Sequence, residues 1–141
     1  MPMKSKKRIV LDAWAVLALI FKEEPAATVV KEIFNQTGRI DTSIVISWIN
    51  IGEIYYLIAR RKNLAAADEV IAEIQQLPLS LNLPSKSDIL EAAALKSKYK
   101  LSYADAFAVA LSQKIDGVIY TGDPEILALK DVAKVQPLKR V

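Results

Sequence analysis

The sequence contains no cysteine and no histidine among its 141 residues. The missing cysteines exclude disulfides, thiolate nucleophiles and thiolate-bound zinc. The missing histidines remove the most common general base and the most common metal ligand of proteins. Any catalysis must therefore use carboxylates, lysine, tyrosine, hydroxyl groups or a metal ion held by oxygen atoms. Because 16 residues are Asp or Glu, chemistry with a hard divalent cation is the leading enzymatic option.

The sequence also lacks a hydrophobic run long enough to span a bilayer. The apolar run from Ile9 to Phe21 follows a basic start, as in a signal peptide, but Asp12 interrupts it early. The segment KEEPAA that follows is a poor cleavage region. We therefore expect a soluble, cytoplasmic protein without a membrane segment.

Composition predicts one folded domain over residues 1–141. Apolar residues make up 52% of the chain, which argues against disorder. The length is sufficient for one sizeable core, and no repeat or linker divides the chain. The formal net charge of +3 permits a nucleic-acid partner without arguing for one.

Short β-branched runs alternate with helical patterns along the chain. Strands are expected at RIVLDA, RIDTSIVIS, LSLNL, GVIYTGD and VAKVQPL. Helices are expected at WAVLALIFKE, 26–36, WINIGEIYYLIARRK, AAADEVIAEIQQ, 88–99, from Ser102 onward, and PEILAL. This alternation predicts an α/β fold with a central parallel sheet of about four to five strands, flanked by helices on both faces. In such sheets, ligands bind beyond the carboxyl ends of the strands.

Four acidic residues differ from the others in their surroundings. Asp12 ends the first expected strand, and Asp123 follows a later strand across Gly122, so both are expected at the carboxyl edge of the sheet. Glu53 lies in the middle of a helix, and Asp105 lies one turn into another. Asp12, Glu53 and Asp105 have apolar neighbours on both sides, where an isolated carboxylate is costly unless it is paired or coordinated.

Three of these acids have an alternative explanation as helix caps. Ser102 and Asp105 have the spacing of a capping box. Asp123 precedes a proline and is a good candidate for an N-cap, which is the better explanation of this residue taken alone. Asp12 could likewise cap the helix that follows it. For each residue alone, a structural role is at least as good an explanation as a catalytic one.

Glu53 is harder to explain in this way. It shares one helix face with Asn50 and Arg60, so a solvated stripe or an ion pair with Arg60 remains the alternative. Taken together, the four acids favour one common pocket. Carboxylates that lie close together raise one another's pKa, and a divalent cation relieves this repulsion. Mg²⁺ or Mn²⁺ retains water that can become hydroxide and attack phosphorus, and this chemistry needs no histidine.

Four segments resemble a known family in their order and separations. They are IVLDAWAVLALIFKEEPAA, SWINIGEIYYLIARRK, LSYADAFAVALS and VIYTGDPEI. The sequence resembles PIN-domain ribonucleases, and most closely the VapC-type toxins of VapBC toxin–antitoxin systems. The resemblance covers nearly the whole chain. Each motif alone is a weak signal, but the four together are highly specific.

The resemblance implies a PIN-like fold and a Mg²⁺- or Mn²⁺-dependent endoribonuclease that cleaves single-stranded RNA and leaves a 5′-phosphate. The implied catalytic and metal-binding residues are Asp12, Glu53, Asp105 and Asp123, with Asn50 and Thr121 as supporting residues. Ala13 departs from the family pattern, because many PIN domains have Ser or Thr directly after the first acid. This difference bears on how the substrate phosphate is held, not on the metal site.

The resemblance also implies RNA as substrate and a VapB-type antitoxin as partner. The apolar runs WAVLALIF and EIYYLIA could form a partner groove or the face of an expected homodimer, and could equally be core. Two alternatives within the family remain open. One is a stand-alone PIN nuclease in RNA processing or decay, and the other is an inactive PIN-like module that binds RNA or protein. A phosphotransfer receiver domain is disfavoured, because only one acid follows the first strand and no lysine ends a late strand.

Basic and aromatic residues give weaker signals. The candidates for attracting RNA are the basic residues within 4–8, 60–62 and 96–100, although each cluster alone is better explained as solvated surface. Trp14 and Trp48 lie in apolar runs and are expected in the core.

Overall fold

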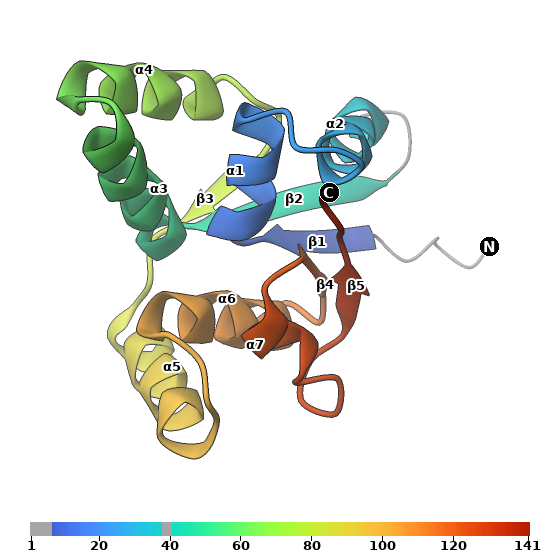
Figure 1. Ribbon diagram of the computed structural model, residues 1–141. Coiled ribbons are helices and arrows are strands. Elements are labelled where there is room, and N and C mark those ends of the chain that lie inside the picture. Colours follow the sequence, from blue (N-terminus) through green and yellow to red (C-terminus); the bar gives the residue numbers. More distant parts are fainter. Residues whose placement is uncertain (1–6, 38–40) are drawn as a thin grey trace.

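Five strands form one sheet in the order β3-β2-β1-β4-β5, and every pairing in it is parallel (Figure 1). The computed structural model describes residues 7–37 and 41–141. The strands are β1 (Lys7–Leu11), β2 (Thr42–Ser47), β3 (Ser80–Asn82), β4 (Val118–Thr121) and β5 (Val135–Pro137). The predicted α/β fold with a parallel sheet is therefore confirmed.

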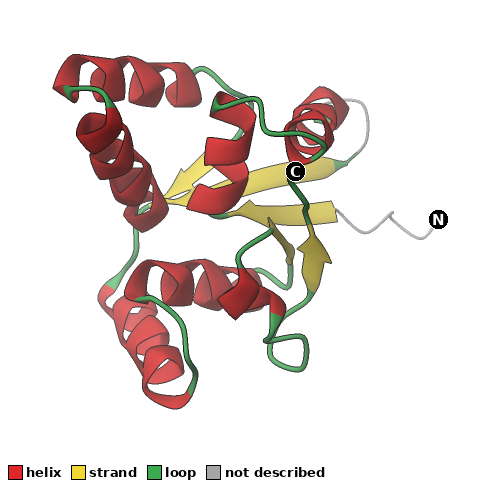
Figure 2. Cartoon of the chain, viewed as in Figure 1, coloured by secondary structure: helices red, strands yellow, loops and turns green. Residues whose placement is uncertain are grey.

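Helices cover both faces of the sheet (Figure 2). They are α1 (Ala13–Ile20), α2 (Ala26–Gln36), α3 (Trp48–Arg61), α4 (Leu64–Gln75), α5 (Lys86–Lys98), α6 (Tyr103–Lys114) and α7 (Pro124–Leu127). Helices α1 to α4 lie on one side of the sheet, and α5 to α7 lie on the other (Figure 1). A parallel sheet needs this arrangement, because its strands are apolar on both faces.

The alternating side chains of β1 connect two separate cores. Ile9 and Leu11 pack with α1 to α4. Val10 points to the opposite face and packs with α5, α6 and α7. All three side chains are fully buried, which is why this strand is a continuous apolar run rather than an alternation of apolar and polar residues.

The order of the strands reverses beside β1. The chain builds β1, β2 and β3 in one direction, then returns to place β4 against the free edge of β1, with Leu11 paired to Tyr120. Such a reversal is a topological switch point, where helices diverge and ligands bind beyond the carboxyl ends of the strands. The residues that follow β1 and β4 are Asp12 and the Gly122–Asp123 pair.

Element boundaries depart from the sequence prediction where a cap was overlooked. Helix α5 begins at Lys86 instead of 88, because Ser85 and Asp88 form a reciprocal capping box. Helix α4 begins at Leu64, because the Asn63 side chain accepts a hydrogen bond from the amide of Ala66. The second expected strand included Arg39 and Ile40, which lie outside the described residues.

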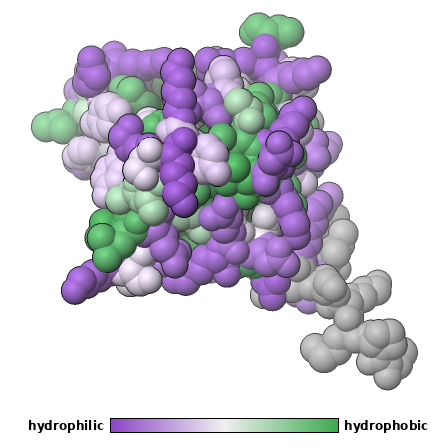
Figure 3. Space-filling model, turned by 90° about the horizontal axis from the view of Figure 1, so that it is seen from below, coloured by the Kyte–Doolittle hydropathy of each residue, from purple (hydrophilic) through white to green (hydrophobic). Residues whose placement is uncertain are grey.

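Most of the face in Figure 3 is hydrophilic, with smaller hydrophobic areas between the polar side chains. The exposed large hydrophobic residues include Leu83 and Leu90, near and on α5. Within 7–37 and 41–141, no helix combines the length and the apolar character needed to cross a membrane.

Candidate functional site

Asp12 lies at the junction of β1 and α1 and uses both of its carboxylate oxygens. Oδ1 accepts a hydrogen bond from the amide of Ala15 at 3.0 Å and so caps α1. Oδ2 accepts a hydrogen bond from the Thr121 hydroxyl. The residue is only 1% exposed. Burial raises the pKa of Asp12 to about 7 although these two hydrogen bonds lower it, and the charges of Asp105 and Asp123 raise it further.

Thr121 joins the ends of β1 and β4. Its hydroxyl donates to Asp12 and accepts a hydrogen bond from the amide of Asp123 at 3.0 Å. The side chain is fully buried. One hydroxyl therefore connects the Asp12 carboxylate to the backbone of Asp123 at the switch point.

Asp105 lies one turn into α6, as predicted. Its amide donates to the Ser102 side chain at 3.1 Å, so Ser102 caps the helix. The residue is 7% exposed. Burial raises the pKa of Asp105 to about 7, and the neighbouring charges of Asp123, Glu53 and Glu125 add to the shift. The Ser102 side chain lowers the pKa of the same carboxyl group.

Asp123 both caps a helix and faces other acids. Its Oδ1 accepts hydrogen bonds from the amides of Glu125 and Ile126, at 2.8 and 3.3 Å, which starts α7. One carboxylate oxygen each from Asp105, Asp123 and Glu125 lie within 4.8 Å of one another. The capping and cluster roles that the sequence left as alternatives are therefore combined in this one residue.

Glu125 is a member of the cluster that the sequence analysis missed. It lies in the first turn of α7, where an acidic residue is usual because it complements the helix dipole. For that reason it does not stand out in the sequence. The available signal was its spacing of two residues from Asp123, which places both side chains at the start of one short helix.

Glu53 approaches the cluster from α3 with an unpaired oxygen. Its Oε1 is buried and has no hydrogen-bond partner among the described residues. Burial raises the pKa of Glu53, the Asn50 side chain lowers it, and the charge of Asp123 raises it. Within the described parts of the chain Glu53 forms no ion pair with Arg60. The alternative explanation of Glu53 as the partner of Arg60 is therefore wrong.

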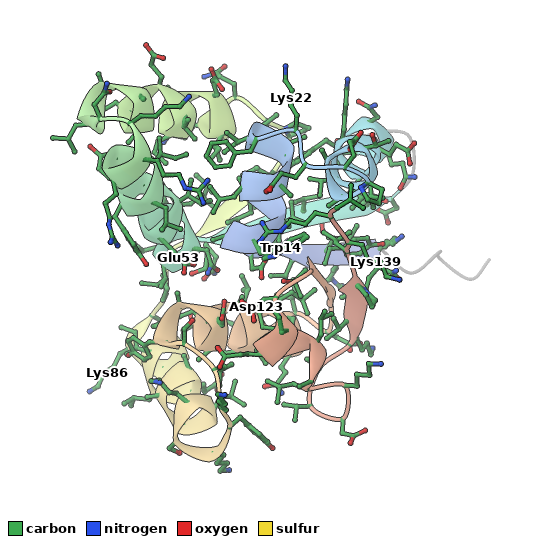
Figure 4. The ribbon with its side chains drawn as sticks, in the orientation of Figure 1. Trp14, Lys22, Glu53, Lys86, Asp123 and Lys139 are labelled. Atoms are coloured by element: carbon green, nitrogen blue, oxygen red, sulfur yellow. The ribbon has the colours of Figure 1, made fainter. Side chains whose placement is uncertain are left out.

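Asn50 connects the two helices that carry Glu53 and Asp105. It is fully buried, and its Nδ2 donates to the carbonyl oxygen of Ala104 at 3.2 Å. Ala104 directly precedes Asp105, so this bond ties the first turn of α6 to α3. Figure 4 shows Glu53, Trp14 and Asp123 around the same region, with Asp123 below the other two.

The donor set fits a hard divalent cation. All the acids of the cluster offer carboxylate oxygen, which Mg²⁺ and Mn²⁺ prefer. The unpaired Oε1 of Glu53 is an acceptor that the described residues leave without a donor. Burial makes the ionised forms of Asp12 and Asp105 unfavourable and so raises the pKa of both, and a bound cation would supply a counter-charge.

Several of the basic and aromatic residues make contacts that differ from the sequence prediction of solvated basic clusters and buried tryptophans. Arg61 lies over the Phe21 ring at 4.8 Å, and Lys96 donates to the carbonyl oxygen of Leu101. Trp14 and Trp48 are partly buried against the core rather than inside it. Lys4 and Lys6 lie outside the described residues.

Comparison with known proteins identifies the same family as the sequence motifs. The PIN domain family model matches residues 9–134. No curated protein sequence matches the chain significantly. Among solved structures, Mycobacterium tuberculosis VapC20, a sarcin–ricin loop cleaving toxin, superposes with a TM-score of 0.70 at 18% identity, covering 86% of this chain and 94% of that one.

Two toxin–antitoxin complexes have similar folds. VapBC2 of Rickettsia felis, bound to a DNA fragment from its promoter, gives a TM-score of 0.71 at 11% identity, covering 94% of this chain and 99% of that chain. DNA-bound VapBC of Salmonella typhimurium gives 0.68 at 14% identity, covering 93% and 98%. These likenesses extend over nearly the full length of each chain.

Proposed function

The chain belongs to the PIN domain family, and we propose that it is a Mg²⁺- or Mn²⁺-dependent endoribonuclease that cleaves single-stranded RNA. The observation that carries this proposal is the cluster of carboxylates beside the switch point of the sheet, whose charges also act on Asp12 and Glu53. Asp105, Asp123 and Glu125 form its tightest group, with oxygens within 4.8 Å of one another. The buried Asp12 and the half-buried Glu53 complete the cluster electrostatically.

Each acid has a distinct place in this proposal. Asp105, Asp123 and Glu125 would hold the cation, and Asp12 would contribute directly or through water. Asp12 is the most constrained of these residues, because both of its oxygens already accept a hydrogen bond. When bound, the cation supplies charge stabilisation at the phosphate and a lower pKa for water.

Glu53 is the proposed proton acceptor. Its unpaired Oε1 and its raised pKa suit a general base. In the reaction, the oxygen of a water molecule bonds to phosphorus, and Glu53 takes a proton from that water. The bond between phosphorus and the 3′-oxygen breaks, and the departing oxygen takes a proton from solvent. The products are a 5′-phosphate and a 3′-hydroxyl.

The test is cleavage of a labelled single-stranded RNA with Mg²⁺ or Mn²⁺, and with EDTA in their place. Cleavage should require the metal, and Asp105→Asn should abolish it. Glu53→Gln should reduce the rate by about 10²-fold or more, the usual worth of a general base. Glu73→Gln, on the exposed face of α4, is the matched control and should cleave as the unchanged protein does.

Two results would contradict this function. One is cleavage that persists in EDTA. The other is full metal-dependent activity in Asp105→Asn, which would remove the cluster from the reaction. An intact, folded protein that binds Mn²⁺ but cleaves no RNA would favour the alternative of a PIN-like binding module.

We further propose that a VapB-type antitoxin is the partner of this chain. The structures of VapBC complexes, whose toxin fold this chain shares, support this proposal. A groove of about 630 Å³ lies at the end of α1 remote from Asp12 and is bounded by α2 and residues 77–78. Leu19, Ala27 and Phe34 line it, and its charged residues are two lysines and one acid: Lys22, Lys31 and Glu24. This combination suits an amphipathic, acidic segment of the antitoxin.

A further inference from the structure

Trp14 packs directly against the turn that carries Asp123. It lies in the first turn of α1, two residues after Asp12, while Gly122 lies between Thr121 and Asp123. A Cβ atom added to Gly122 would come within 2.3 to 2.6 Å of Cζ2, Cη2 and Cε2 of the indole. Such distances are far below van der Waals contact. The turn and the indole therefore fit together only because residue 122 has no side chain.

A second segment holds the indole in place. The Arg140 guanidinium lies over the Trp14 ring at 5.0 Å and forms an ion pair with Glu23 at 3.1 Å. The backbone around Arg140 is fixed on both sides. Leu138 donates to the carbonyl oxygen of Thr121 at 2.8 Å. Further along, Ala26 donates to Lys139 and Val141 donates to Glu24, at 2.9 and 3.1 Å. Figure 4 shows Lys139 on the same side of the sheet as Trp14.

We propose that Trp14 is a positioning residue for the carboxylate cluster: its indole, held by Arg140, supports the Thr121–Asp123 turn so that Asp123 faces Asp105. The inference rests on the proposed metal-binding function of the cluster. Hydrogen bonds hold Thr121 and Asp123 on either side of the turn. Gly122 between them has no side chain, and the indole is the group that packs against it. A small displacement of the turn would separate Asp123 from Asp105 and Glu125, whose oxygens must converge on one ion.

The experiment compares two glycine-to-alanine variants. Gly122 does not have a left-handed φ, so alanine there tests space and not backbone conformation. Gly122→Ala should displace the turn and weaken Mn²⁺ binding by about 10- to 100-fold, the usual effect of disturbing residues that orient metal ligands. Gly52→Ala is the matched control: it also directly precedes an acid of the cluster, but its added methyl group meets no atom within 4 Å. Its Mn²⁺ affinity, measured by calorimetry, should not change.

Replacing the indole by a smaller side chain should restore Mn²⁺ binding to the Gly122→Ala variant. In the double variant Gly122→Ala with Trp14→Leu, the new methyl group has room, so Mn²⁺ should bind more tightly than in Gly122→Ala. Trp14→Leu alone should weaken binding to a smaller degree, because the turn loses its support. The proposal is overturned if folded Gly122→Ala binds Mn²⁺ normally, if Trp14→Leu does, or if the double variant is as weak as Gly122→Ala.

A metal-free measurement separates this inference from the proposed function. The Asp123 amide donates to Thr121, so its hydrogen exchange reports the position of the turn without any ion. Exchange should be faster in Gly122→Ala and slower again in the double variant. If the unchanged protein binds no Mn²⁺, the proposed function fails, and the exchange rates still decide whether Trp14 positions the turn. Equal exchange in all variants would reject the inference alone.

Discussion

At the scale of single residues, burial makes the ionised forms of Asp12 and Asp105 unfavourable in the folded protein. Burial raises the pKa of both from 3.8 to about 7. In the unfolded chain both return to ordinary values, so the folded state binds their protons more tightly. Their contribution to the free energy of unfolding is complete below about pH 4 and is lost as the pH rises through about 7.

This relation predicts a pH-dependent stability for the metal-free protein. Between pH 5 and 8 in EDTA, the free energy of unfolding should decrease by at least about 1.4 kcal/mol, the value of one pKa unit. Asp105→Asn cannot ionise at this position, so its decrease should be smaller. Urea unfolding at a series of pH values measures both.

Mn²⁺ provides the control, because it binds the ionised carboxylates of the folded state only. Adding it at pH 8 should raise the melting temperature, whereas at pH 5 protonation competes and the rise should be smaller. A metal-free stability that is flat from pH 5 to 8, or that increases, would show that these acids are not buried together.

Apolar surroundings were the signal that identified the acids in the sequence. Asp12, Glu53 and Asp105 lie in apolar runs. Asp105 belongs to the close group of acids, and the charge of Asp123 acts on Asp12 and Glu53. Capping proved to be compatible with cluster membership, since Asp12 and Asp123 do both. The sequence did not identify Glu125, because an acid in the first turn of a helix is common and is explained by its interaction with the helix dipole. Only its position in space distinguishes it from the solvated acids.

At the scale of elements, two serine caps at the starts of neighbouring helices allow a matched test. Ser102 caps α6, which carries Asp105, and Ser85 caps α5, which carries no acid of the cluster. Either serine replaced by alanine should lower the free energy of unfolding by about 1 kcal/mol. Only Ser102→Ala should also weaken Mn²⁺ binding, because the first turn of α6 positions Asp105. Chemical denaturation and calorimetry give the two quantities.

One result would contradict the role of Ser102 in positioning Asp105. Equal Mn²⁺ affinity in Ser102→Ala and Ser85→Ala would mean that the first turn of α6 is held by other contacts. The Asn50 bond to Ala104 is the nearest such contact.

Local patterns were sufficient to predict most elements but not their arrangement. The β-branched runs and helical periodicities located every strand and helix in the described residues to within a few positions. The strand order could not be deduced from them, because nothing local states that β4 returns to pair with β1. That pairing brings together residues more than one hundred positions apart, and it is what creates the site.

At the scale of the whole molecule, the proposed partner leads to a cellular test. Expression of the chain should arrest growth, and co-expression of a small protein from a neighbouring reading frame should relieve the arrest. Reversing the charges of Lys22 and Lys31 to Glu should abolish this relief, because both line the groove proposed for the acidic antitoxin segment. Growth curves and co-purification measure toxicity and complex formation.

Lys86→Glu is the control, since this exposed lysine begins α5 on the other side of the sheet (Figure 4). It should leave both toxicity and relief unchanged. A chain that is harmless on expression, yet cleaves RNA in vitro, would instead favour the stand-alone nuclease in RNA processing or decay. The expected homodimer stays a prediction.

The return of β4 to β1 also determines when the acids can come together during synthesis of the chain. Residues 7–82 emerge first and contain Asp12 and Glu53, but the opposing acids at 105, 123 and 125 are translated later. Until β4 arrives, one side of β1 has no neighbour, and Thr121 is absent as the donor to Asp12. The proposed metal site therefore cannot assemble on a growing chain before residues 118–125 have been translated and β4 has paired with β1.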